Sequence, residues 1–178
     1  MTIRYAILGF LSWRPFTGYE LKKVFADSEY FHWSGNNNQI YSTLVQLHRE
    51  GLVTSEVQPQ EHLPARKVYT LTPAGQGELR RWVASAPELP QSRNPFLVQL
   101  AWADLLSPAE LDALLARYEE EVNLQLLMLR EKERRQLPRP ARTPREADLW
   151  RTLAETRLVA YEGELAWARR LRQQLAEM

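Results

Sequence analysis

The 178-residue chain contains no cysteine, and this absence narrows the chemistry open to it. Without thiols it can form no disulfide, bind no metal through thiolates and use no thiol nucleophile. Long apolar runs are missing as well, since no stretch approaches the ~20 residues that cross a bilayer. The apolar segment YAILGFLSW (5–13) has neither a basic cluster before it nor a small-residue cleavage site after it, unlike a secretion signal. We therefore expect a cytoplasmic protein with no membrane association.

Catalytic and metal-binding motifs are also missing from the sequence. The three histidines, His32, His48 and His62, have no metal-ligand spacing, and no glycine-rich nucleotide-binding motif or serine-nucleophile motif occurs. The acidic residues mostly alternate with arginine, as in EEEVNLQLLMLREKERR (119–135), where pairing along a helix is the simpler explanation. We therefore expect no enzyme activity, no catalytic residues, no metal site and no cofactor.

Neither sign of charge is in clear excess, because the chain has 23 Lys and Arg and 22 Asp and Glu, which gives a net charge of +1. Residues 1–82 hold nine basic and seven acidic residues (+2), and the remainder holds 14 and 15 (−1). Any surface that attracts nucleic acid must therefore be local. Hydrophobic residues make up 44% of the chain, which is enough for a packed core.

Glycine and proline divide the chain into two parts. Six of the seven glycines lie in residues 1–77, and PELPQSRNP (87–95) carries three prolines. This composition predicts a compact, turn-rich domain over 1–86, a linker over 87–94 and a helical domain over 95–178.

In the first part, the apolar spacing predicts three helices, over 2–13, 17–27 and 35–50. Gly51 stands where a helix end favours a left-handed residue. The β-rich runs LVTSEV (52–57) and RKVYTL (66–71), separated by QPQEHLPA, predict a hairpin with a long loop. Thr72 and Pro73 then predict the start of a further helix, which carries Leu79, Trp82 and Val83.

The second part is predicted to be helical throughout. A short apolar helix over 96–106 precedes two long ones, which begin at the cap sequences SPAE (107–110) and TPRE (143–146) and end near 136 and 176. Each long helix would span about 45 Å. Their apolar stripes are too extensive for an antiparallel pair alone, which predicts a homodimer. The residues that we assign to dimerisation are Leu111, Leu115, Tyr118, Val122, Leu153, Trp167 and Leu171.

Three helices followed by a hairpin are the parts of a winged helix-turn-helix, so the fold class expected is mainly α with a small β-hairpin. In such folds the third helix enters the DNA major groove. Its outward face would carry amide, hydroxyl and basic side chains suited to base edges and phosphates, namely Asn36, Asn37, Asn38, Gln39, Ser42, Thr43, Gln46 and Arg49. The alternative is that SGNNN (34–38) is only a polar turn with Ser34 as the cap. Phosphate contacts are predicted from Lys22, Lys23, Arg66 and Lys67, with ordinary solvated surface as the alternative.

The chain resembles the PadR family of transcriptional regulators, in the subgroup with the longer C-terminal region. The resemblance lies in YAILGFL (5–11), TGYELKKVF (17–25), FHWS (31–34), QIYSTLVQLHREGLV (39–53) and KVYTLTPAGQGELRRWV (67–83), and extends less specifically through FLVQLAWADLLS (96–107). It implies a dimeric DNA-binding protein, usually a repressor, released from DNA by a small effector such as a phenolic acid. Family members often have proline after the IY pair, where this chain has Ser42. Tyr41 matches the family motif and would either touch a phosphate or pack against the wing or second helix.

Aromatic residues near the junction of the two parts are candidates for an effector pocket or, alternatively, for core. They are Phe16, Tyr19, Phe31, Trp33 and Trp102. No carboxylate-binding residue stands out among them, so a phenolic acid is implied by the resemblance alone.

The sequence thus predicts a homodimeric regulator, most simply a repressor. Two recognition helices would enter successive major grooves of double-stranded DNA about 34 Å apart, at a two-fold operator. The alternative is a winged-helix module for protein–protein interaction, without sequence-specific DNA binding.

Overall fold

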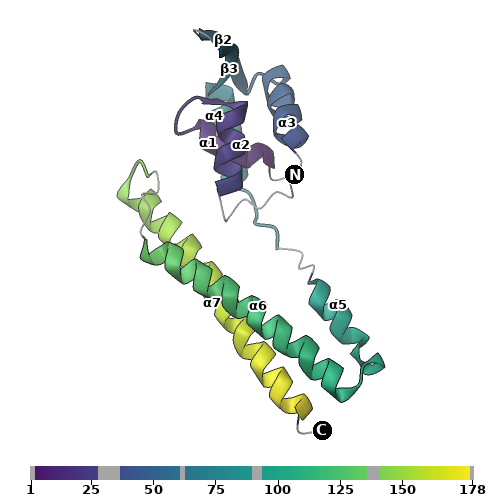
Figure 1. Ribbon diagram of the computed structural model, residues 1–178. Coiled ribbons are helices and arrows are strands. Elements are labelled where there is room, and N and C mark those ends of the chain that lie inside the picture. Colours follow the sequence, from purple (N-terminus) through teal and green to yellow (C-terminus); the bar gives the residue numbers. More distant parts are fainter. Residues whose placement is uncertain (1–2, 28–36, 61–62, 90–93, 136–140, 177–178) are drawn as a thin grey trace. The chain divides into compact units, whose positions relative to one another are not determined.

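A computed structural model describes residues 3–27, 37–60, 63–89, 94–135 and 141–176. The chain divides into two compact units, Met1–Leu89 and Pro90–Met178, which are described separately (Figure 1). None of the described helices is long and apolar enough to cross a membrane.

The described part of unit 1 contains four helices and a small sheet. The helices are α1 Ile3–Leu11, α2 Gly18–Asp27, α3 Asn37–Arg49 and α4 Pro73–Val83. Apolar residues on one side of each of the first three helices meet in a single core, joined by Phe16, Val53 and Tyr69 of the strands. The most deeply buried side chains of this core are Ile7, Leu8, Leu21, Leu44, Leu47 and Val53.

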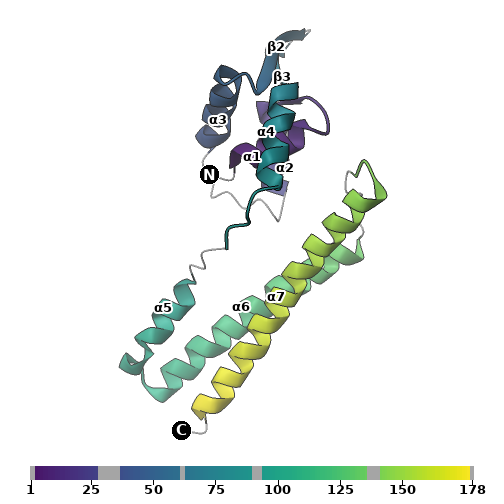
Figure 2. The same ribbon diagram turned by 180° about the vertical axis from the view of Figure 1, so that it is seen from behind.

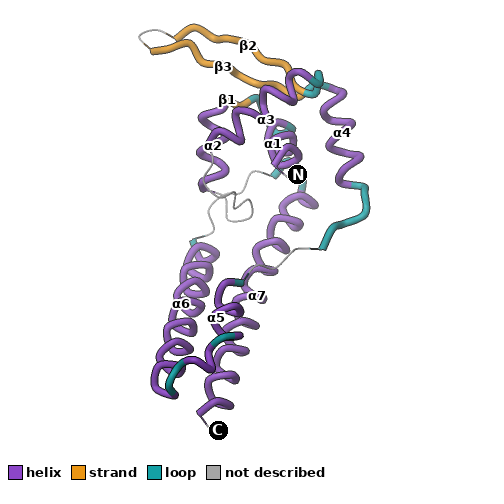
Figure 3. The backbone as a smooth tube through the Cα atoms, turned by 90° about the vertical axis from the view of Figure 1, so that its right-hand side faces the viewer, coloured by secondary structure: helices purple, strands orange, loops and turns teal. Residues whose placement is uncertain are grey.

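The sheet has three antiparallel strands in the order β1–β3–β2. Strands β2 Val53–Gln60 and β3 Leu63–Leu71 form the hairpin, and β1 Phe16–Thr17 adds a short edge to β3. The ribbon of β2 and β3 projects past the helices of unit 1 (Figure 3). The predicted long loop over 58–65 is wrong, because pairing continues to Gln60 and Leu63.

Local capping explains where several helices begin and end. The Thr17 hydroxyl accepts from Glu20 N at 3.1 Å, and the Glu20 carboxylate accepts from Thr17 N at 2.7 Å, which starts α2. At α4 the Thr72 hydroxyl accepts from Gly75 N at 3.0 Å, with Pro73 in the first turn. Gly51 follows α3 with φ +70°, the left-handed conformation expected there. Of the three apolar residues expected on this helix, Leu79 packs against the core, whereas Trp82 and Val83 are exposed.

Unit 2 consists of a short helical segment followed by a helical hairpin. The predicted helix over 96–106 is in fact α5 Pro95–Ala101, capped by Asn94, and a 3-10 turn at Ala103–Leu105. The long helices are α6 Pro108–Arg134, which begins with the predicted capping box at Ser107, and α7 Pro144–Ala176.

Helices α6 and α7 lie antiparallel and side by side, as Figures 1 and 2 both show. Val122, Leu126 and Leu165 form the buried centre of their contact. Three ion pairs cross the hairpin at 2.7–2.8 Å, namely Arg130–Glu162, Arg169–Glu119 and Arg172–Asp112. Exposed ion pairs of this kind each contribute about 0–1 kcal/mol to stability. They therefore help to set the register of α6 against α7, while burial of apolar side chains provides most of the stability.

Candidate nucleic-acid interface

Helix α3 has one buried face and one face open to solvent. Ile40, Leu44 and Leu47 are buried in the core of unit 1 and hold the helix in place. At 3.6 residues per turn, the opposite face carries Asn38, Ser42, Val45 and Arg49 along its centre, flanked by Gln39, Tyr41 and Gln46, and all of these are exposed. A surface of this composition offers hydrogen-bond donors, acceptors and one cation in a row.

The first turn of α3 holds the part of the asparagine cluster that the structure describes. Asn37 begins the helix, and Asn38 and Gln39 are exposed. Ser34 and Asn36 lie outside the described residues, as does the side chain of Asn37, so the predicted cap falls there too. The exposed amides occupy the turn where recognition helices usually contact base edges.

Two hydroxyl groups on α3 donate to the same backbone carbonyl. Ser42 Oγ lies 3.1 Å and Thr43 Oγ1 lies 2.7 Å from the carbonyl oxygen of Gln39. Each hydroxyl thereby uses its proton within the helix and keeps its lone pairs as acceptors. Ser42 is exposed and can present these lone pairs to a ligand, whereas Thr43 is half-buried at the edge of the face.

A small polar network fixes the second half of α3. Gln46 Nε2 donates to Glu50 Oε1 at 2.9 Å, and Glu50 Oε2 pairs with Arg4 of α1 at 2.7 Å. Arg4 therefore balances the one acidic side chain at the end of α3, where an unpaired carboxylate would repel phosphate. We did not predict this network from the sequence, because Arg4 and Glu50 lie 46 residues apart.

Tyr41 packs across the start of α2. A Cβ atom placed on Gly18 would lie 2.4 Å from Tyr41 Cε1, so glycine is needed for the ring to approach the backbone so closely. The side chain nevertheless remains 45% exposed. Two roles were predicted for Tyr41, packing and contact with a phosphate. The structure shows the ring packed against the second helix, with part of it still accessible to solvent.

The basic residues predicted to contact phosphate all lie at the surface of unit 1. Lys23 is exposed and Lys22 half-buried on α2, whose start is held by the Thr17–Glu20 box. Burial tends to raise the pKa of Glu20, but hydrogen bonds from Thr17 and Arg14 outweigh it and lower that pKa below its usual value. The box therefore stays ionised at neutral pH.

On the hairpin, Arg66 and Lys67 project from opposite faces, because successive side chains of a strand alternate. Arg66 stands opposite Gln58, and its Nε donates to Gln58 Oε1 at 3.1 Å. Lys67 stands opposite Val57, which is 63% exposed, and its ammonium lies 5.5 Å from the Tyr69 ring centroid. A ligand that lies along one face of the wing would therefore meet one of these two cations directly.

The predicted effector residues have different environments. Phe16 is buried in the core of unit 1, with the Arg14 guanidinium 3.8 Å from its ring centroid. Tyr19 in unit 1 and Trp102 in unit 2 are each 70% exposed. Phe31 and Trp33 lie outside the described residues.

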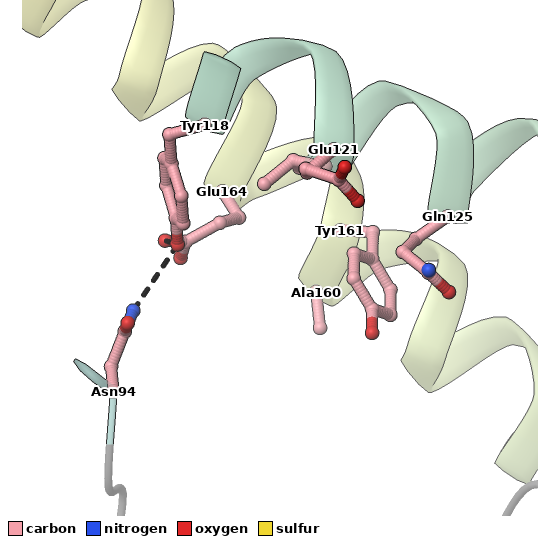
Figure 4. Close-up of a pocket in the computed structure, with 8 residues that line it drawn as sticks. Asn94, Tyr118, Glu121, Gln125, Ala160, Tyr161 and Glu164 are labelled. Carbon is pink, nitrogen blue, oxygen red and sulfur yellow. Dashed lines mark hydrogen bonds between the residues drawn. The ribbon is translucent and has the colours of Figure 1, made fainter. Parts of the chain in front are cut away.

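The structure also contains a hollow in unit 2 that we did not predict from the sequence. It has a volume of about 390 Å³ and lies along the α6–α7 hairpin beside Asn94 (Figure 4). Asn94 Nδ2 donates to the Tyr118 hydroxyl at 3.2 Å, and this hydroxyl donates to the Glu164 carboxylate. Burial, and then the bond to Glu164, raise the pKa of Tyr118 above its ordinary value. In the residues that the structure describes, no group of three acidic or histidine side chains is arranged to hold a metal ion.

Comparisons with known families match the chain in two consecutive segments. The model of the transcriptional regulator PadR-like family matches residues 7–81, and that of the virulence activator alpha C-terminal region matches residues 92–176.

Among curated proteins, the negative transcriptional regulator PadR of Bacillus subtilis is 31% identical over 109 residues, which is 61% of this chain and 60% of that protein. A probable transcriptional regulator of Mycobacterium tuberculosis is 34% identical over 47% of this chain and 44% of its own length. The matched segments thus span only about half the length of these relatives.

Among solved structures, Bacillus subtilis PadR in complex with operator DNA matches with a TM-score of 0.85 and 24% identity, over 98% of this chain and 99% of that one. The same protein in complex with p-coumaric acid matches with a TM-score of 0.82, 22% identity and 99% coverage of both chains. The virulence activator AphA of Vibrio cholerae matches with a TM-score of 0.72 and 26% identity, over 98% of both chains. The predicted fold class, a winged helix followed by a helical hairpin, is confirmed by these likenesses and by the observed elements.

Proposed function

The chain belongs to the PadR-like family of transcriptional regulators, and we propose that it is a homodimeric DNA-binding repressor released from its operator by a small aromatic effector. The observation that carries this proposal is the exposed face of α3, which presents amide and hydroxyl groups from a helix anchored in the core. The solved complexes of Bacillus subtilis PadR with operator DNA and with p-coumaric acid support the same proposal.

In this proposal, α3 enters the major groove and its amides determine sequence preference. Asn38 and Gln39 can each bond bidentately to adenine, and the acceptor lone pairs of Ser42 can take a base N–H. Val45, which lies 43% exposed at the centre of the same face, offers an apolar contact for a thymine methyl group. Arg49, Lys22 and Lys23 would neutralise phosphates on either side, with Arg66 or Lys67 on the wing.

Dimerisation is proposed for unit 2. Leu115 and Val122, which we predicted to lie in a dimer interface, are already buried within the hairpin of one chain. Large apolar side chains remain exposed on α5, the following turn and both long helices, which is typical of a surface that a second subunit covers. They are Leu97, Val98, Trp102, Leu105, Leu124, Leu127, Met128, Leu149, Leu153 and Val159.

An effector would act by binding one arrangement of the dimer better than the other. It shifts the population only by the ratio of its two affinities. The form that it favours must hold the two α3 helices at a spacing that no longer matches successive major grooves.

The proposal is tested by fluorescence anisotropy with DNA from the region upstream of the protein's own coding sequence, at moderate and fixed salt. We expect saturable binding to this fragment that is at least tenfold tighter than binding to a shuffled fragment of equal composition. Equal binding to both fragments, or no binding by the folded protein, would overturn the proposal and favour a protein-interaction module.

A further inference from the structure

The hollow on unit 2 has a chemical character that the proposed function does not use. Its lining residues come from the start of α5 and from facing turns of α6 and α7, and they are Asn94, Tyr118, Glu121, Val122, Gln125, Ala160, Tyr161 and Glu164 (Figure 4). Two of them are acidic, two are phenols, two are amides, and none is basic. A volume of about 390 Å³ falls within the range of small-molecule sites.

The acidic groups stand where a bound molecule would meet them. Glu121 is exposed on α6. Glu164 is half-buried on α7, where its carboxylate accepts a hydrogen bond from the Tyr118 hydroxyl. In Figure 4 the Glu164 carboxylate lies at the Tyr118 hydroxyl, and the Glu121 carboxylate lies on the side of Tyr161. Neither forms an ion pair of 4.0 Å or less that the structure records, in contrast to Glu119 and Glu162 on the same helices.

The tyrosines and the apolar lining complete the site. Tyr118 is held rigidly, because its ring stacks on Phe96 with centroids 3.6 Å apart and an interplanar angle of 6°. Tyr161 is half-buried, and buried Val122 contributes apolar surface. Electron-rich ring faces beside carboxylates attract organic cations through both cation–π and ion-pair interactions.

We propose that this hollow binds an aromatic amine, whose ammonium group pairs with Glu121 and Glu164 and whose ring lies against Tyr118 or Tyr161. An aromatic carboxylate of the same size would meet two like charges and no cation in the lining. The ligand charge selected by this hollow is thus opposite to that of a phenolic acid. Its role as the effector rests on the regulatory function proposed above, whereas the binding itself does not.

The experiment uses the full chain and two probes that share a phenol ring but differ in charge, tyramine and phloretate. Titration calorimetry and amide NMR would measure the affinity of each. We expect tyramine to bind saturably and to shift signals of Tyr118 and Tyr161, with phloretate weaker by about tenfold or more, the ratio that follows from one ion pair in a partly solvated site. Equal or tighter binding of phloretate to the same residues, or saturable binding of neither probe, would overturn the proposal.

Substitution separates this site from the general negative charge of the helices. Glu121→Gln should weaken tyramine by about tenfold, whereas Glu120→Gln, an exposed neighbour outside the lining, should leave it unchanged. If Glu120→Gln weakens tyramine binding as much as Glu121→Gln does, or more, the proposed site is wrong. Anisotropy with the upstream DNA, measured on the same samples without ligand, keeps the two proposals distinct. If the wild-type protein does not bind this DNA, the regulatory function is overturned. If it shows no preference for tyramine over phloretate, the proposed amine site is overturned.

Discussion

Replacement of Asn38 by alanine tests the proposed recognition face of α3 at an exposed amide in its first turn. If Asn38 bonds bidentately to one base, its removal should weaken operator binding by about 1–3 kcal/mol, or roughly 5- to 150-fold. The same change should leave stability almost untouched, within about 0.5 kcal/mol, because the side chain is exposed and the structure records no bond from it.

The assay is fluorescence anisotropy on the selected operator, on operators altered at single positions, and on unrelated DNA, all at one salt concentration. We expect Asn38→Ala to bind unrelated DNA as the wild type does and to lose discrimination at one base-pair position of each half-site. Gln76→Ala, which removes an exposed amide from α4, is the matched control and should change neither affinity. If Asn38→Ala binds the operator with unchanged affinity and preference, or weakens all DNA alike, direct base recognition by this residue is refuted.

Three further results should follow from the account. Arg66→Ala should weaken binding to all sequences alike and reduce the magnitude of the slope of log K against log salt concentration by about one. An unchanged slope would mean that Arg66 does not contact a phosphate. Leu127→Glu places a charge in the exposed apolar surface of α6, so light scattering should show a monomer at micromolar concentration in place of a dimer. Glu20→Gln should lower the melting temperature by more at pH 7 than at pH 3. The folded chain holds the pKa of Glu20 below its unfolded value of about 4.3, so the ionised box stabilises above that pH and is lost as pH falls through the folded pKa. Equal melting differences at both pH values would contradict this cause.

Helix ends were predictable wherever a few neighbouring residues determine them. The Thr72–Pro73 start, the Ser107 capping box and Gly51 depend on hydrogen bonds or backbone angles within one turn, and the structure has all three. The order and type of the helices and strands could be predicted from these helix ends together with the spacing of apolar residues.

The missed strands have a different cause, because they depend on pairing between strands and not on hydrogen bonds within one turn. Strand β2 continues past Pro59, a residue with a low preference for strand, because Gln58 and Gln60 on either side of it pair with β3 across an irregularity in register. The two-residue strand β1 is too short to be recognised from sequence, and exists only by pairing with β3.

The hollow on unit 2 was missed because its residues lie far apart in the chain. Tyr118 lies 24 residues from Asn94 and 46 residues from Glu164, and only the register of α6 against α7 brings the three together. In the sequence Tyr118 belongs to an apolar stripe, and its hydroxyl gave no separate signal. Asn94 before Pro95 was a recognisable cap, but its second role as a donor to Tyr118 could not be read from local sequence.

Selection from a random double-stranded library would show whether this chain recognises DNA sequence through α3. The protein would be bound to the library at fixed, moderate salt, and the retained DNA sequenced over successive rounds. We predict enrichment of one two-fold symmetric sequence, with half-sites whose centres lie about one turn of DNA, or roughly 34 Å, apart. A folded protein that retains DNA without enriching any sequence would contradict it.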